Sequence, residues 1–321
     1  MRKLFIGLFL VFIIFDISFA HTEIENCLRF TEDGKYRRAI HLGKKAVELY
    51  PQDINSFLCL ADAYIMSGDF NSGIDILNNA QKTFTESSDL LFIYNRLALA
   101  YHTIHEYDNA VKYSNKYLAI ARELKSKEDE IIALNILIEL AEEKLDFDKA
   151  IVYYEEALKI ADEKNAAVLY SNLGGIYREK GDYVNAINNI KKAIEINRKN
   201  LDNHGVAIAT LNLGNTYRTA KDFVKAEKYI NEGPKQILEF KDIYWEGNAY
   251  KYFGWLYRDK KDFKKAKEYL LKAYNIYVLI DREPDKGIVF NDIKMIDLLE
   301  SSQDIEQKSE IIKKEDHNEV K

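Results

Sequence analysis

A short pattern that recurs along the chain constrains the fold more than any other feature of the sequence. Each copy has an aromatic residue followed three positions later by a small residue, as in GDYVNA and KDFKKA. The small residues of the seven copies are Ala39, Gly73, Ala110, Ala150, Ala186, Ala226 and Ala266, which gives steps of 34, 37, 40, 36, 40 and 40 residues. Near-constant periods of this length indicate stacked units, none of which buries its apolar face alone. The chain of 321 residues is therefore expected to fold as a repeat array.

The composition indicates that the repeated units are helical. The chain has only three prolines and fourteen glycines, and it is rich in Leu, Ile, Ala, Lys and Glu. These are good helix formers, whereas glycine and proline interrupt helices. The predicted fold class is all-α.

The unit at residues 166–197 shows the pattern of a helix pair most clearly. Four residues of its first half are spaced i, i+3, i+4 and i+7, on one stripe of a helix: Tyr170, Leu173, Gly174 and Tyr177. Gly181 is expected to end this helix in the left-handed conformation, and Asp182 to cap the next helix. The small side chains of Gly174 and Ala186 predict that the two helices approach closely there.

In order and spacing, these residues resemble the tetratricopeptide repeat: aromatic, Leu-Gly, Tyr, Gly-Asp-Tyr, then Ala. The resemblance covers residues 54–280 well and residues 24–53 less well. Several periods near forty are similar to the longer repeats of kinesin light chains and of the Leu-Gly-Asn-repeat adaptors. The resemblance implies a right-handed superhelical solenoid of about seven stacked antiparallel helix pairs over residues 21–280.

The sixth unit departs from the pattern. Its second helix contains Gly233 and Pro234 where the helix should continue. Proline removes a helical hydrogen bond and clashes with the preceding turn, so we expect this helix to kink or to restart there.

The two ends of the chain differ from the repeats. Residues 1–20 begin with two basic residues, continue with an apolar run of about a dozen residues and end at Ala20, which is the layout of a secretory signal peptide. A membrane span needs roughly twenty apolar residues. We therefore expect cleavage after Ala20 and an exported protein, periplasmic or secreted, without a stable membrane anchor. Residues 281–300 are expected to form an amphipathic capping helix, and residues 301–321 a charged, disordered tail.

The two cysteines of the chain are Cys27 and Cys59. In an oxidising compartment they could form a disulfide, and two buried thiols are an equally good interpretation. The pattern does not choose between the two.

No arrangement of residues typical of an enzyme stands out. His102 and His105 are three apart, but no further ligands complete a metal site, so we interpret them as solvated histidines at a helix end. The acidic stretch that contains Glu139 and Glu142 is interpreted as a solvated face, with no reason for shifted pKa values. No enzymatic activity, metal ion or cofactor is expected.

The resemblance implies that the protein is a binding scaffold. In the family, the first helices of successive repeats line a groove that holds a peptide. The residues expected on that face are Asn135, Asn172, Arg178, Asn212, Asn215, Arg218, Lys251, Tyr252, Trp255 and Arg258. Each arginine directly follows the tyrosine of the packed stripe in its helix and is rotated from it by about 100° toward the groove side.

The arginines also predict the kind of partner. Planar guanidinium groups suit carboxylates, so the expected ligand is an acidic peptide or protein segment, or a free carboxyl terminus. The formal net charge of −6, without a basic block, argues against nucleic acid. Reversing the charge of Arg218 is predicted to weaken binding and to leave the melting temperature near that of wild type.

Two alternatives stay open. Each arginine could instead pair with a local carboxylate such as Glu179 or Asp259, because ion pairs at helix ends are common. The protein could also be an exported sensor or an accessory subunit of an enzyme, in which the repeats serve as a structural spacer.

Overall fold

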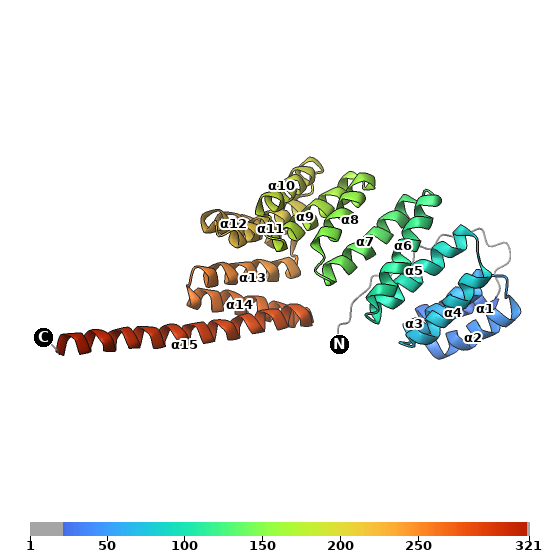
Figure 1. The fold of residues 1–321 in the computed structure, drawn as a ribbon, viewed down its shortest axis with the longest axis horizontal. Helices are drawn as coiled ribbons and strands as arrows, with labels where there is room; N and C mark the ends of the chain where they lie inside the picture. The colour runs from blue at the N-terminus through green and yellow to red at the C-terminus, as the bar shows by residue number, and fades with distance from the viewer. Residues whose placement is uncertain (1–21, 320–321) are drawn as a thin grey trace. The chain divides into compact units, whose positions relative to one another are not determined.

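The computed structural model describes residues 22–319, apart from the side chains of residues 234, 236, 238 and 302–319. Within this range the chain forms fifteen α-helices and no strand (Figure 1). The prediction of an all-α repeat fold is confirmed. The predicted signal peptide, residues 1–20, lies outside the described residues.

Fourteen of the helices form seven antiparallel pairs, and we call the first helix of each pair its A helix and the second its B helix. The N-terminal unit, residues 22–161, holds four pairs: α1 (Thr22–Glu32) with α2 (Tyr36–Leu49), α3 (Ile54–Met66) with α4 (Phe70–Thr83), α5 (Ser87–Thr103) with α6 (Tyr107–Glu123), and α7 (Lys127–Glu143) with α8 (Phe147–Ile160). The C-terminal unit, residues 162–319, holds three pairs and a last helix: α9 (Glu163–Glu179) with α10 (Tyr183–Lys199), α11 (Asn203–Thr219) with α12 (Phe223–Phe240), α13 (Ile243–Asp259) with α14 (Phe263–Leu279), and α15 (Glu283–Glu319).

The pair α9 and α10 shows why small residues recur. A Cβ atom on Gly174 would lie 2.5 Å from Ile190 Cγ1 and 3.0 Å from the carbonyl oxygen of Ala186, so the two backbones are nearly in contact. The expected caps are present as well, since Gly181 has a φ of +84° and the side chain of Asp182 accepts a hydrogen bond from a backbone N–H of the first turn of α10. The local interpretation of this unit from its sequence is confirmed.

Enlarging Ala186 should therefore destabilise the C-terminal unit. Ala186 is fully buried at the crossing, and Ala186→Leu is expected to lower the free energy of unfolding by about 1–3 kcal/mol because the crossing has no room for the larger side chain. Val184→Leu, at an exposed position of the same helix, is the control and should leave the melting temperature unchanged. Equal melting temperatures for both variants would show that Ala186 is not at a close crossing.

The turns between helices carry an unusual backbone conformation. Among residues 22–319, eight residues other than glycine have positive φ angles, between 54° and 63°, and each is the first or second residue after the end of a helix: His105, Lys125, Leu145, Leu201, Lys221, Lys241, Lys261 and Asp281. The left-handed region favours glycine, because a Cβ atom approaches the following carbonyl oxygen there. The backbone of these eight residues is therefore held in a strained conformation.

Relieving this strain at one turn should stabilise the protein. Leu201 has a φ of 57° and is 84% exposed, so its side chain contributes little packing. Leu201→Gly is expected to raise the free energy of unfolding by up to about 1 kcal/mol, since the strain relieved is partly offset by the flexibility that glycine adds to the unfolded chain. The converse change, Gly181→Ala in the turn between α9 and α10, where φ is +84°, should lower it. Denaturant unfolding checks both, and a loss of stability in Leu201→Gly would contradict the argument.

Two expectations for the helices differ from the structure. Helix α12 runs without interruption through Gly233 and Pro234, so of the two expected outcomes the restart is wrong and the kink stays a prediction. Ile230 and Ile237, on either side of these residues, are fully buried in the core shared with α11, and this packing outweighs the local preference of the sequence.

At the C-terminus, helix α15 extends to Glu319, whereas the sequence predicts a disordered tail from residue 301. The stretch contains no glycine or proline, and it is rich in Glu, Gln and Lys, which are good helix formers. The density of charged residues therefore does not predict where the last helix ends.

Candidate functional site

The forty-residue period of the C-terminal unit brings equivalent residues of successive A helices into line. Arg178, Arg218 and Arg258 occupy the same position of α9, α11 and α13, and the same step relates Asn215 to Trp255. Ten side chains on α11, α13 and α15 are joined by hydrogen bonds, ion pairs or ring contacts. We call them the polar belt: Asn212, Asn215, Arg218, Lys251, Tyr252, Trp255, Arg258, Asp259, Asp285 and Asp292.

Arg218 is the most enclosed arginine of the belt. Its side chain is 10% exposed. Its Nε donates to Asn215 Oδ1 at 2.9 Å, Nη1 donates to Asp259, and the guanidinium lies 5.2 Å from the ring centre of Trp255. Burial lowers the pKa of the Arg218 guanidinium from its ordinary value, and the carboxylate of Asp259 opposes that shift. Arg218 is thus held in a fixed position by partners on α11 and α13.

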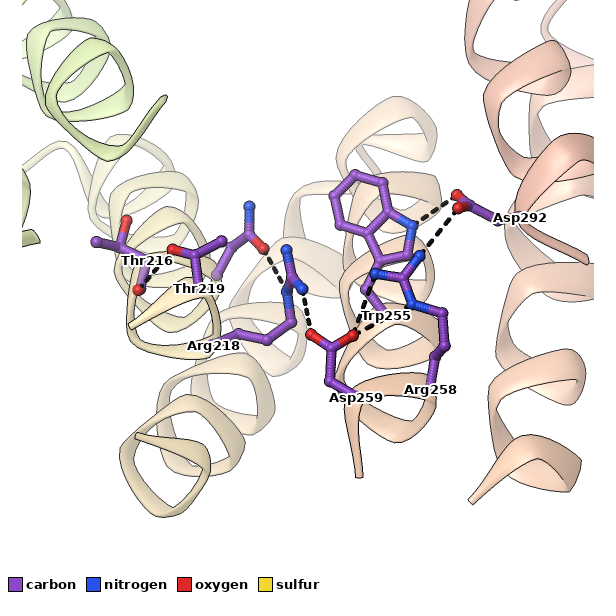
Figure 2. Close-up of polar contacts among 8 residues, drawn as sticks. Thr216, Arg218, Thr219, Trp255, Arg258, Asp259 and Asp292 are labelled. Carbon is purple, nitrogen blue, oxygen red and sulfur yellow. Dashed lines mark hydrogen bonds and ion pairs between the residues drawn. The ribbon is translucent and has the colours of Figure 1, made fainter. Parts of the chain in front are cut away.

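Asp259 lies between two arginines, as Figure 2 shows. Its Oδ1 accepts from Nε and Nη2 of Arg258 at 3.2 and 3.1 Å. Nη1 of Arg258 donates to Asp292 Oδ1 at 3.0 Å, and the indole N–H of Trp255 donates to Asp292 Oδ2 at 2.7 Å. Asp292 belongs to α15, so the last helix supplies the carboxylate that ends this chain of contacts.

Lys251 is a second buried cation of the belt. Its Nζ lies 3.4 Å from Asp285 Oδ1 and between 5.4 and 5.9 Å from the ring centres of Tyr252, Trp255 and Tyr277. Burial lowers the pKa of Lys251, and Asp285 opposes this effect. An ammonium group surrounded by aromatic faces is stabilised by their negative potential, so this lysine is held as part of the packed structure.

The structure joins several of the predicted residues across neighbouring A helices, but some of them are buried. Tyr252 donates to Asn212 Oδ1 at 3.4 Å, and Asn212 donates to Ser171 of α9 at 3.4 Å, which connects three A helices. Tyr252, Asn215 and Lys251 are buried rather than open to a ligand.

Two predicted residues of α9 stand apart from the belt. Asn172 is exposed, whereas the side chain of Arg178 is 17% exposed and bonds to its exposed neighbour Glu179 at 2.9 Å. Asn135, also exposed, lies on α7 of the N-terminal unit.

The alternative in which the arginines pair with carboxylates describes the observed contacts well. Arg178 pairs with Glu179, and Arg258 with Asp259, as that alternative states. The sequence interpretation missed Asp285 and Asp292. They lie beyond the last recognised repeat, and only an extension of the forty-residue register into α15 would have indicated them.

The acidic stretch of the N-terminal unit also differs from its interpretation. His102 is buried, not solvated, with Nε2 3.1 Å from Glu143 Oε2, whereas His105 is exposed in a turn. Neighbouring groups remove part of the water around Glu139 and Glu142 and raise the pKa of both, so the expectation of unshifted carboxylates is wrong, although Glu139 is exposed as the interpretation of a solvated face states. Within the part of the chain that the structure describes, no three His, Cys, Asp or Glu side chains are grouped as metal ligands.

No helix among residues 22–319 combines the length and the apolar character that crossing a membrane requires.

Comparison with known proteins agrees with the repeat pattern. Family models described as tetratricopeptide repeat match residues 89–163, 165–233 and 253–277. No curated protein sequence matched the chain.

Three solved structures are similar in fold. BtubC (BKLC) from P. vanneervenii is 23% identical, with 69% of this chain and 94% of that chain covered and a TM-score of 0.52. A signal transduction ATPase with a tetratricopeptide repeat sensor from Pyrococcus horikoshii is 18% identical, with a TM-score of 0.58; the match covers 88% of this chain and only 50% of that one. The apo form of RapI is 14% identical over 79% of this chain and 99% of that chain, with a TM-score of 0.55. At these identities the likeness concerns the fold alone.

Proposed function

Because the chain belongs to the tetratricopeptide repeat family, we propose that it is an exported scaffold that binds a peptide or protein segment along the A helices of its C-terminal unit. The observation that carries this proposal is the polar belt. Polar side chains of this length are ordinarily mobile, but here hydrogen bonds between neighbouring repeats hold them in place, and the innermost of them are buried. A surface ordered in advance loses less entropy when a ligand binds.

Asn172 and Arg178 are the residues of this face best placed to meet the partner. Both belong to α9, whose Ser171 accepts from the belt residue Asn212. The carboxylate that pairs with Arg178 is the exposed Glu179, so a carboxylate of the partner exchanges with it at little cost. Arg218 and Arg258, in contrast, are committed to Asp259 and Asp292. The partner that suits these two side chains is an acidic segment, which bonds to Arg178 through a carboxylate and to Asn172 through its backbone.

Co-purification with the native partner, followed by titration of the Arg178→Ala variant, tests the proposal. We expect affinity to fall about tenfold or more for Arg178→Ala, as for the loss of a charge-assisted hydrogen bond, and to depend less steeply on salt. The control is Arg198→Ala, which removes the same charge from an exposed position on α10. A partner that binds Arg178→Ala as tightly as wild type would overturn the assignment of the face, and failure to retain any partner would favour a spacer.

The exported location is part of the same proposal. It is supported by the charge and apolar pattern of residues 1–20 and by the pairing of Cys27 with Cys59, because disulfides persist in oxidising compartments. Mass spectrometry of the native protein should find a chain that starts at His21. A native chain that retains Met1 would refute cleavage.

A further inference from the structure

The outer face of helix α2 carries a line of basic side chains. Arg37, His41 and Lys44 are spaced i, i+4 and i+7, on the side opposite the small buried residues of this helix, and all three are exposed. Arg38, beside this line, is exposed as well. Residues 34–47 contain five lysines and arginines and no Asp or Glu, although the whole chain has a formal net charge of −6. The one carboxylate of α2 is Glu48, in its last turn.

The arginines of the first helix pair differ from most arginines of the protein, which pair with a carboxylate. Among the ten arginines of residues 22–319, six form ion pairs with Asp or Glu: Arg96, Arg122, Arg178, Arg218, Arg258 and Arg282. Of the four that form none with a described residue, three lie on α1 and α2, and Lys44 lacks such a partner too. We call these four exposed side chains the basic patch: Arg29, Arg37, Arg38 and Lys44.

The neighbouring carboxylates do not neutralise the basic patch. Asp33 pairs with Lys35, and Glu23 pairs with Lys45, each at 2.8 Å. Glu32, at the end of α1, is exposed and forms no ion pair with a described residue. The four cations of the basic patch are therefore left without a fixed partner.

The ring of Phe30 lies among these cations. The guanidinium groups of Arg29 and Arg38 lie 5.1 and 5.9 Å from its centre, and the ammonium group of Lys35 lies 5.6 Å from it. Each cation is attracted by the face of the ring, which offsets part of their mutual repulsion. Phe30 is half-buried, and the adjacent Leu28 is 36% exposed. Cations next to accessible aromatic and leucine side chains are typical of surfaces that lie on a membrane.

The layout of the basic patch suits a surface with many phosphate groups better than a single anion. Guanidinium groups bind phosphate through parallel N–H donors. Arg37 and Lys44 are about 10 Å apart along the axis of α2 and face outward, so one small anion meets only part of the patch. A nucleic acid also presents phosphates in a row, but it offers no apolar layer for Phe30 and Leu28. The headgroup region of a bilayer provides both.

We propose that the first helix pair docks on a membrane surface that contains anionic phospholipids, through the basic patch and the ring of Phe30. The patch is complementary in charge to the lipid phosphates, and the chain as a whole, being acidic, is not attracted to them. Four cations and one ring give reversible attachment to the surface, unlike a helix that spans the bilayer. The docking involves neither Arg178 nor Asn172 and goes beyond the proposed binding function.

Co-sedimentation of the purified protein with phospholipid vesicles tests the docking. Vesicles of phosphatidylcholine with about one-third phosphatidylglycerol are expected to bind wild type at least about tenfold more tightly than phosphatidylcholine alone. The neutral vesicles also measure any contribution of the apolar run in residues 1–20. About 0.5 M salt should release the protein from the anionic vesicles, because it screens charges at an exposed surface.

The variant that tests the basic patch combines Arg37→Ala, Arg38→Ala and Lys44→Ala. It should lower the affinity for anionic vesicles about tenfold or more. The matched control combines Lys191→Ala, Lys192→Ala and Arg198→Ala, which removes the same charge from exposed positions of α10. The control should bind like wild type, because Glu195 lies between Lys191 and Arg198 on the same face of that helix.

Far-ultraviolet circular dichroism establishes that each variant is folded. If the triple variant of α2 loses helix content, Arg37→Glu replaces it and must weaken binding as well, since Arg37 is exposed and pairs with no described residue. Wild type that binds anionic and neutral vesicles equally overturns the proposal, and so does an α2 variant that binds as tightly as wild type. Equal losses in the α2 and α10 variants assign the binding to overall charge and overturn the patch. Wild type that binds soluble polyphosphate but no vesicle overturns the membrane as the occupant.

Discussion

Arg218→Glu is expected to lower the free energy of unfolding by about 3–5 kcal/mol, the usual cost of breaking a buried ion pair. The new carboxylate would face Asp259 in an enclosed site and would leave the Asn215 side-chain oxygen without its donor. Wild type tolerates the burial of this charge because Asp259 compensates it. The sequence alone predicts an unchanged melting temperature for this variant, and the structure leads to the opposite expectation.

Arg178→Glu is the matched control, since it makes the same substitution at the same position of the preceding repeat. Its partner Glu179 is exposed, so we expect a loss within about 1 kcal/mol. Denaturant unfolding of both variants, with a double-mutant cycle of Arg218→Gln and Asp259→Asn, measures the coupling. Equal losses for the two reversals would mean that Arg218 is a solvated surface residue after all.

The contrast between these two arginines shows what the sequence could predict. Within one repeat, spacing is decisive: the crossing of Gly174 with Ala186 and the cap at Asp182 depend on residues less than twenty positions apart, and they follow from helix geometry. The partner of Arg218 is Asp259, forty-one residues later, on the next A helix. Choosing that partner needs the stacking of repeats, which sequence spacing describes only approximately.

The buried histidine was misjudged for the same reason. His102 meets Glu143, forty-one residues later, and this contact depends on how α5 and α7 are stacked. Taken alone, each residue fits the end of a solvated helix. Stacking also removes water around Glu142, which raises its pKa even though Tyr154 donates to it at 2.8 Å.

Removing the disulfide should have an effect almost as large as Arg218→Glu. Cys27 of α1 and Cys59 of α3 are both fully buried and bonded, with Cα atoms 6.2 Å apart, within the range of native disulfides. The bond joins residues 32 positions apart. Replacing both cysteines by alanine is expected to cost about 2–4 kcal/mol, because the unfolded chain regains the freedom that the bond removes. Thermal unfolding of the N-terminal unit should show the loss.

A reductant separates the bond from the packing of the two side chains. It should lower the melting temperature of wild type and leave the double alanine variant unchanged. Without reductant, wild type in denaturant should have no thiol that reacts with an alkylating reagent, and two reactive thiols would refute the bond. Protein made without export, in a reducing cytoplasm, should carry both thiols and melt at the lower temperature. The N-terminal unit would then reach its full stability only where the proposed export delivers it.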